Sequence, residues 1–294
     1  VYKRQGINSA KYATIGGNFI PSENIGEVLN QGIDACVNWN DKVGEDFTYN
    51  LGLNITFTKN KLRKTNELSN IEDYRKSIGQ PTSAIFGWQS QGLFGKDVAI
   101  AGHPFQSFGN YQVGDIAYAD LNNDGMVDNN DQTRIGQSFP KTTLGVDVTL
   151  NYKGFGLYIL GTATTGVTQM LTSTYYWNKG LDGYSVLAED RYHPVNNPTG
   201  TQPRLTTTSG VNNYRNSTFW TKNGSFFRLK NVELSYTLNN NSKKGIGKNY
   251  KFFVRGANLF VLSGIKELDP EQMLAGISNY PVYRTITGGV SINF

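Results

Sequence analysis

The stretch TYNLGLNITFT, residues 48–58, alternates large apolar side chains with small polar ones. The apolar positions are Tyr49, Leu51, Leu53, Ile55 and Phe57, and each is followed by Asn, Gly or Thr. Successive side chains of a β-strand point to opposite faces, so a period of two residues indicates a strand. The stretch therefore predicts a strand with one apolar face and one polar face.

The same period recurs along the chain, whereas a helical period of 3.6 residues never persists for three turns. Further strands are predicted at 33–40, 144–152, 154–163, 224–238, 249–262 and 283–294. The expected fold class is all-β, with about seven long strands.

Composition narrows the class of protein. Of the 294 residues, 17% are charged and 13% are aromatic, and a charged fraction well below the usual ~25% is unlike a typical cytosolic enzyme. No run approaches the ~18 apolar residues that a membrane-spanning helix needs. The net charge of +5 comes from scattered Lys and Arg, which does not favour nucleic acid as a partner. The single Cys36 excludes an internal disulfide.

Short and long connections alternate between the predicted strands. The short ones are 41–44, 153–154 and 239–248, and the long ones are 59–142, 164–223 and 263–282. Soluble β-sandwiches also contain alternating strands, but outer-membrane barrels keep short turns at the periplasmic end and long loops outside the cell. The connections therefore favour a transmembrane barrel, and polar faces rich in Thr, Asn, Ser and Gly suit its wet lumen.

The two ends of the chain carry separate signals. The opening VYKRQGIN has neither an initiator Met nor a signal segment, so either a leader has been removed or the sequence begins within a longer protein, and we expect the second. Phe294 closes an alternating strand and resembles the terminal aromatic that acts as an assembly signal in outer-membrane barrel proteins. The alternative is a sandwich strand that ends on Phe.

Several segments, in order, resemble the C-terminal part of the SusC/RagA family of TonB-dependent outer-membrane transporters. The most specific is VGDIAYADLNNDGMVDNNDQTRIGQSFPK, residues 113–141, which is similar throughout to the family's GDIKYKDLNGDGKIDENDRTVIG followed by PK. The other segments are 25–40, 84–94, 220–238, 255–271 and 280–294. In the first of these, Gln31, Gly32 and Asp34 stand in for the family's Asn-x-Gly-x-Glu.

The resemblance implies the C-terminal portion of a large antiparallel transmembrane β-barrel with long extracellular loops, in the outer membrane of a Gram-negative bacterium. Barrels of this class have ~22 strands and a plugged lumen. Residues 1–294 would form the last third, without the plug domain and N-terminal strands, and would leave a hydrogen-bonding edge open near residue 25.

The function implied by the resemblance is TonB-dependent import of a large nutrient, an oligosaccharide or a peptide. The implied partners are a SusD-like lipoprotein, outer-membrane lipid and, through the missing N-terminal part, the TonB complex. A second class of function stays open, a calcium-stabilised, β-rich carbohydrate-binding surface module. The apolar faces of its strands would enclose a core, whereas those of a barrel face lipid.

The segment DLNNDGMVDNND, residues 120–131, has the spacing of a twelve-residue calcium loop. Its candidate ligands are Asp120, Asn122, Asp124, the Met126 carbonyl, Asp128 and Asp131. It departs from an EF-hand at its last position, where Asp replaces Glu, and neither flank has a helical pattern. We expect a structural Ca²⁺ ion; the alternative is a loop that caps itself through Asx turns.

The family resemblance implies that the chain ends at the periplasmic side of the barrel, so Phe294 is expected there. Counting strands back from Phe294 places the short connections 41–44, 153–154 and 239–248 on the periplasmic side. The long connection 59–142 is then outside the cell. Within it, 95–141 is predicted to be a long extracellular loop that carries 120–131, where millimolar calcium would fill even a weak site. The same count makes 84–94 part of a loop hairpin and not a membrane span.

Aromatic side chains cluster in the long connections. The candidate substrate contacts are Trp88, Tyr175, Tyr176, Trp177 and Trp220. Exposed flat rings near Asn, Gln and Asp suit stacking on sugars or peptides. The alternative is that these rings pack the loops or form an interfacial girdle.

Catalytic constellations are missing from the sequence. His103 and His193 lie far apart in predicted loops, without an HExxH, a GxSxG or a Cys-His pairing. The carboxylate pairs Glu189 with Asp190 and Glu267 with Asp269 are close neighbours in the chain, which does not by itself predict a glycosidase. We therefore expect no catalytic residue and no enzyme activity.

Overall fold

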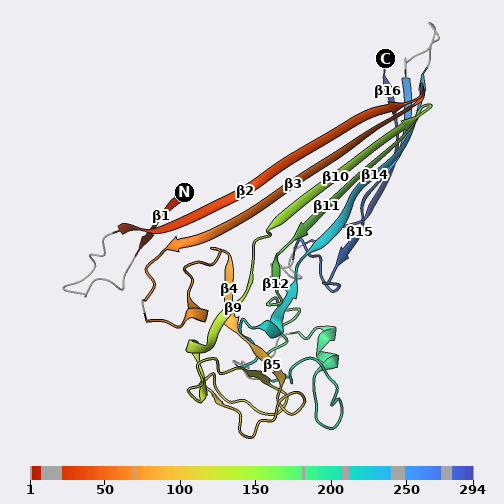
Figure 1. Ribbon diagram of the computed structural model, residues 1–294. Helices are drawn as coiled ribbons and strands as arrows, with labels where there is room; N and C mark the ends of the chain where they lie inside the picture. The colour runs from red at the N-terminus through yellow and green to blue at the C-terminus, as the bar shows by residue number, and fades with distance from the viewer. Residues whose placement is uncertain are drawn as a thin grey trace.

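The computed structural model of the chain describes residues 2–7, 22–68, 70–180, 183–206, 212–239, 249–272 and 280–293 (Figure 1). Phe294 and the predicted short connection after residue 239 lie outside the described residues. Within the described ranges, no helix has both the length and the apolar character to cross a membrane.

One antiparallel sheet of eight strands dominates the fold, in the order β1-β2-β3-β10-β11-β14-β15-β16. Its members are β1 (Tyr2–Ile7), β2 (Ser22–Val43), β3 (Phe47–Lys64), β10 (Thr142–Tyr152), β11 (Phe155–Thr165), β14 (Phe226–Asn239), β15 (Asn249–Ser263) and β16 (Thr285–Asn293). The all-β prediction is confirmed, and each of the seven predicted long strands forms, although β2 extends well beyond the predicted 33–40. The short strand β1 has no counterpart in the sequence prediction.

Tight turns join the strands at one end of the sheet. Between β10 and β11, the partners Tyr152 and Phe155 enclose Lys153 at φ 46° and Gly154 at φ 88°. Two successive residues with positive φ make the kind of hairpin turn whose twist matches that of the flanking strands. Gly44, at φ 66°, supplies the left-handed residue in the turn between β2 and β3. These short connections fix the register of the long hairpins.

The apolar side chains of neighbouring strands fall on one face of the sheet. In register, Trp39 of β2 lies beside Leu51, which lies beside Val148, and that row continues to Ile159. Leu53, one row away, remains 41% exposed and so is not packed inside a protein core. This outward apolar face agrees with the barrel prediction and not with the closed core of a sandwich module.

An aromatic row crosses the sheet at its short-turn end. The paired positions are Phe47, Tyr152, Phe155, Tyr236 and Phe252. The rings of Phe155 and Tyr236 have their centroids 4.5 Å apart. Aromatic rows of this kind mark the interface between the apolar band of a transmembrane barrel and water.

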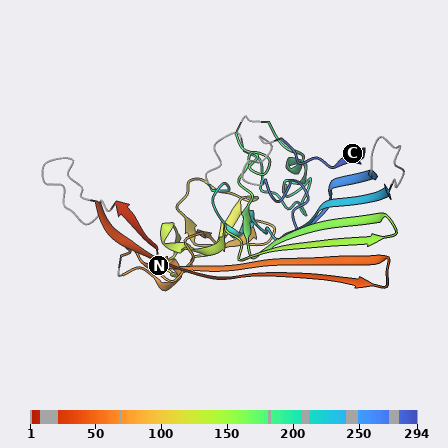
Figure 2. The same cartoon turned by 90° about the horizontal axis from the view of Figure 1, so that it is seen from above.

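The long connections gather at the other end of the sheet, as Figures 1 and 2 show. We call their described residues, within 65–141, 166–225 and 264–284, the loop body. Its strands are β4 (Ala84–Trp88), β5 (Ser90–Leu93), β6 (Phe105–Gln106), β7 (Ile116–Tyr118), β8 (Met126–Val127), β9 (Gln132–Gln137), β12 (Thr168–Met170) and β13 (Thr221–Asn223). Its 3-10 helices are η1 (Asp73–Arg75), η2 (Asn129–Asp131), η3 (Val186–Asp190) and η4 (Thr218–Trp220).

Residues 84–94 do not cross the large sheet, as predicted. They form two short strands, and β4 pairs with β9 while β5 pairs with β7. The expected loop hairpin is wrong in this detail, because the partners of both strands come from farther along the same connection.

Candidate functional site in the loop body

The loop body has a hydrophobic core of its own. The buried members are Trp88, Leu93, Phe108, Ile116, Tyr118, Val127, Leu171, Tyr176, Tyr192, Trp220 and Ile265. They come from all three long connections, and so the connections fold onto one another instead of projecting separately. A packed body of this kind can hold a binding surface in a fixed shape at the end of the barrel.

An ion pair with a buried carboxylate joins two of the connections. Asp115 is 1% exposed, and its carboxylate lies 2.8 Å from the guanidinium of Arg204. The same carboxylate accepts hydrogen bonds from the Asn213 side chain at 2.7 Å and from the Gln112 amide at 2.8 Å. Because each carboxylate oxygen has donors, the buried charge is compensated.

Amide side chains extend this polar cluster beneath β7. The buried Gln106 donates to the Asn212 side chain at 2.6 Å and accepts from the Tyr118 amide at 2.7 Å. The Tyr118 hydroxyl donates to the Asn212 carbonyl at 2.8 Å, and burial raises the pKa of Tyr118, so that this donor stays protonated. The cluster thereby fixes residues 212–213 against the β7 strand.

The acidic loop 120–131 is organised by hydrogen bonds from its own backbone. Asp120 accepts from the amides of Asn123 at 2.7 Å and Gly125 at 2.9 Å. Asp131 accepts from the amides of Leu121 at 2.7 Å and Asp128 at 2.8 Å. These are the bonds that the self-capping alternative requires.

The remaining candidate ligands of the loop are bonded in the same way. Asp124 accepts from the Met126 amide at 2.9 Å and from the Asn122 side chain at 2.8 Å, and Asp128 caps η2. In the part of the chain that the structure describes, no three His, Cys, Asp or Glu side chains converge as a metal site. The donor chemistry suits Ca²⁺, since carboxylate oxygens keep further lone pairs, and calcium binding stays a prediction.

Three contacts anchor the acidic loop to the loop body. The Trp88 indole N–H donates to the Asp128 carbonyl at 2.7 Å. Around Asn130, the Tyr74 hydroxyl donates to its carbonyl at 2.9 Å and Arg75 donates to its side-chain oxygen at 2.8 Å. The acidic loop is thus held from both η1 and β4.

The candidate aromatic contacts are mostly core residues. Trp88, Tyr176 and Trp220 are 7%, 3% and 2% exposed, so the expectation of exposed rings is wrong for these three. The cause is that the three long connections fold together, which a single stretch of sequence does not reveal. Tyr175 and Trp177 are only partly buried against the same core, and for them substrate contact stays a prediction.

Cations and rings stack next to Trp177 and Trp88. Lys179 Nζ lies 5.5 Å from the ring centroid of Trp177 and 5.8 Å from that of Tyr214. Burial raises the pKa of Tyr214 to about 12. The Arg215 guanidinium lies 3.9 Å from the Phe108 ring and 5.2 Å from that of Trp88, and burial lowers its pKa. Cation–ring contacts of this kind stabilise a cationic side chain at the face of an aromatic ring.

The residues considered as catalytic candidates contact neighbouring protein groups. His103 contacts the Gln91 side chain at 3.1 Å, and His193 accepts from the Asn196 amide at 3.0 Å. Glu267 lies 3.4 Å from Lys222. Each of these groups therefore belongs to a separate local contact.

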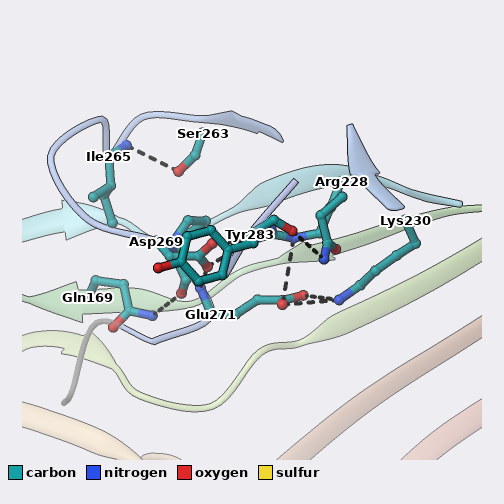
Figure 3. A network of polar contacts seen from close by, with 10 residues as sticks. Gln169, Arg228, Lys230, Ser263, Ile265, Asp269, Glu271 and Tyr283 are labelled. Atoms are coloured by element: carbon teal, nitrogen blue, oxygen red, sulfur yellow. Dashed lines mark hydrogen bonds and ion pairs between the residues drawn. The ribbon is translucent and has the colours of Figure 1, made fainter. Parts of the chain in front are cut away.

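Figure 3 shows how the last long connection is fastened to the sheet. Arg228 of β14 is 3% exposed, and its terminal nitrogen lies 2.7 Å from both carboxylate oxygens of Asp269. Lys230 bonds both oxygens of Glu271 at 2.9 and 3.0 Å. These pairs hold residues 269–271 against β14.

Comparison with known proteins now places this architecture. No family model matches the chain. A TonB-dependent receptor of Formosa agariphila is 27% identical over 298 residues, covering 92% of this chain and 30% of the receptor. The TonB-dependent receptor SusC of Bacteroides thetaiotaomicron is 26% identical over 303 residues, covering 98% of this chain and 29% of SusC.

Solved structures give the same result for the fold. The RagAB peptide importer in its open-open state superposes with a TM-score of 0.71 at 17% identity, over 99% of this chain and 31% of that chain. The RagAB peptide transporter gives a TM-score of 0.68 at 18% identity, over 93% of this chain and 30% of that chain. The chain is SusC/RagA-like.

This SusC/RagA-like chain spans about 30% of the length of the curated relatives that it matches. The family resemblance of residues 113–141 includes Asp115 and Tyr118 but does not reveal their buried roles. Sequence reasoning missed Gln106, Arg204 and Asn213 altogether. Their only signal is polar residue type, which does not distinguish a buried cluster from a solvated loop.

Proposed function

We propose that the protein containing this SusC/RagA-like chain imports a large nutrient across the outer membrane of a Gram-negative bacterium, with energy from TonB. The observation that carries the proposal is the division of the chain into an outward apolar sheet and a packed loop body at one end. A transporter needs a lipid-facing wall and a shaped opening. The named relatives are receptors and transporters, which supports a function without catalysis.

The nutrient class that we propose is an oligosaccharide or a peptide. The RagAB structures are of a peptide transporter, whereas partly buried rings such as Tyr175 and Trp177 suit sugar as well as peptide stacking. The proposed extracellular partner is a SusD-like lipoprotein seated on the loop body. Ca²⁺ in the acidic loop 120–131 would keep that loop in one shape beneath the lipoprotein.

The experiment is uptake in a deletion strain complemented with the full-length gene. Fluorescent oligosaccharides and peptides are supplied separately, and an affinity tag on the transporter tests for co-purification of a lipoprotein. Tyr175→Ala should reduce uptake several-fold, whereas Tyr280→Ala, a 76% exposed residue in the connection before β16, should not. If the complemented strain imports neither class better than the deletion strain, the proposal is refuted.

A further inference from the structure

Four cationic side chains surround a cavity where β3, the start of β10 and the loop body meet. The cavity has a volume of about 260 Å³, and Lys59, Lys61, Arg134 and Lys141 contribute to its lining. A neighbouring cavity of about 420 Å³ shares Arg134 and Lys141. Neither cavity has an Asp or Glu among its described lining residues, so the pair forms a positive site.

Within the described ranges, the charges around the first cavity have no acidic partner. Arg134 donates there to neutral acceptors, the Gln80 side chain at 2.9 Å, the Gln137 side chain at 3.0 Å and the Gly136 carbonyl. Among the described residues, no side-chain hydrogen bond or ion pair involves Lys59, Lys61 or Lys141.

Elsewhere in the chain, many basic side chains are paired with carboxylates. The pairs include Arg63 with Glu27, Lys76 with Asp73, Arg204 with Asp115, Lys222 with Glu267 and Arg228 with Asp269. Clustered, uncompensated cations attract an anion from outside the protein.

The arginine of the site is held in a fixed orientation. Gln137, which accepts from Arg134, is 7% exposed. Its amide nitrogen donates to the carbonyls of Phe139 at 3.0 Å and Gly166 at 2.8 Å. Because the amide is fixed by two backbone acceptors, its oxygen orients the guanidinium before any ligand arrives. Such preorganisation lowers the entropy lost on binding.

The two lysines of β3 lie on the outward face of the sheet. The register of β3 with β2 continues without a bulge from Phe57 opposite Ile33 to Lys61 opposite Leu29. Lys59 and Lys61 therefore share the face of Leu53 and Phe57. Along β3 towards the loop body, they come after Phe57, the last apolar residue of that face. Phe57 and Phe139, which also line the cavity, are 42% and 65% exposed.

We propose that this cavity binds the phosphate-bearing headgroup of a lipid in the outer leaflet, an inference that rests on the proposed outer-membrane location. On that face, the end of the apolar band marks the level of the lipid headgroups. Lysines bind phosphate as point charges and arginine as a planar fork. The exposed rings of Phe57 and Phe139 lie beside them, where acyl chains would begin.

The test titrates lipid A into the purified full-length transporter in detergent and measures retained lipid by native mass spectrometry. Bisphosphorylated lipid A is the probe, and the same lipid without its phosphates is the reference. A basic residue near an anionic lipid surface contributes roughly fivefold in affinity. The double variant K59Q/K61Q should therefore bind the probe about 25-fold more weakly, and K59R/K61R should bind nearly as the parent does.

The matched control is K42Q/K64Q, which removes the same charge from β2 and β3 at residues that line neither cavity. It should leave lipid A affinity within about twofold of the parent. Equal weakening in both double variants, or equal binding of the dephosphorylated lipid, overturns the proposal. Displacement of lipid A by inorganic phosphate or oligogalacturonate at matched concentration also overturns it, because the site would then serve a soluble anion.

The same variants in the uptake assay separate this inference from the proposed function. K59Q/K61Q should import as the parent does, since no residue of the sheet's polar face has changed. Loss of lipid binding in a parent that still imports refutes the headgroup site alone. A parent that binds lipid A but imports neither nutrient class refutes the proposed function alone.

Discussion

Replacing Leu53 by Arg would place a guanidinium in the middle of the outward apolar face. Leu53 lies between Val37 and Val146 in register, and six residues along β3 from Phe47 of the aromatic row. At ~3.3 Å per residue and a strand tilt of about 40–45°, that separation corresponds to roughly 14–15 Å of depth, near the middle of an apolar band about 25 Å tall. Arg at that depth costs about 2–4 kcal/mol, so Leu53→Arg should lower the unfolding free energy by that amount.

The assay is denaturant unfolding of the full-length protein in lipid vesicles, with Asn54→Arg as the matched control. Asn54 is on the opposite face, in register with Cys36 and Gly145, and an Arg there would project into the polar side. The control should change the free energy of unfolding by less than about 1 kcal/mol. Equal costs for the two variants, or a larger cost for Asn54→Arg, would show that the apolar face does not contact lipid.

Three further predictions concern the loop body. Asp115→Ala should destabilise it by about 1–3 kcal/mol, since the buried Asn213 side chain and the partly exposed Arg204 guanidinium lose their acceptor, and hydrogen exchange of residues 112–118 in the full-length protein should rise accordingly. Asp120→Ala with Asp124→Ala should abolish calcium heats in calorimetry; equal, negligible heats in parent and variant would leave only the self-capping loop. The Thr201 side chain donates a hydrogen bond to Asp190 and holds the pKa of that carboxyl below its usual value. The stability that this bond contributes is present above the unfolded-state pKa near 4. It is lost as the pH falls through the lower pKa of the folded state. The protection factor of the Thr201 amide, its intrinsic exchange rate at each pH divided by the observed rate, should therefore fall in acid, and a flat protection factor would contradict that linkage.

The large sheet could be predicted from sequence because its determinants are local and periodic. The alternation at Leu51, Leu53 and Ile55 specifies a strand and its faces without knowledge of any partner. The turn at Lys153 and Gly154 likewise has a short local signal. By contrast, β1 was missed because it is only six residues long and its pairing with β2 depends on residues far from its own sequence.

The loop body could not be predicted in the same way because its contacts are between distant segments. A tryptophan such as Trp88 or Trp220 suits a ligand-stacking surface as well as a hydrophobic core. Only the packing of the three long connections determines which of the two roles it takes. Asp115 and Arg204 are separated by 89 positions along the chain, so neither one indicates the other. The acidic loop is intermediate: its spacing is a local signal, but hydrogen bonding and metal binding make use of the same oxygens.

The two parts of the chain are therefore stabilised by different surroundings. Leu53 and its neighbours on the sheet remain exposed in the protein and need lipid to cover them, whereas Trp220 and Asp115 are enclosed by the protein itself. Leu53→Arg and Asp115→Ala perturb residues that share no partner, so their costs should add within about 0.5 kcal/mol. The loss of unfolding free energy caused by Leu53→Arg should depend on the surrounding lipid, whereas the loss caused by Asp115→Ala should not. Membrane insertion and the shape of the loop body can then be perturbed separately, and loss of the proposed import through Asp115→Ala in a fully inserted barrel would show that this import needs an intact loop body.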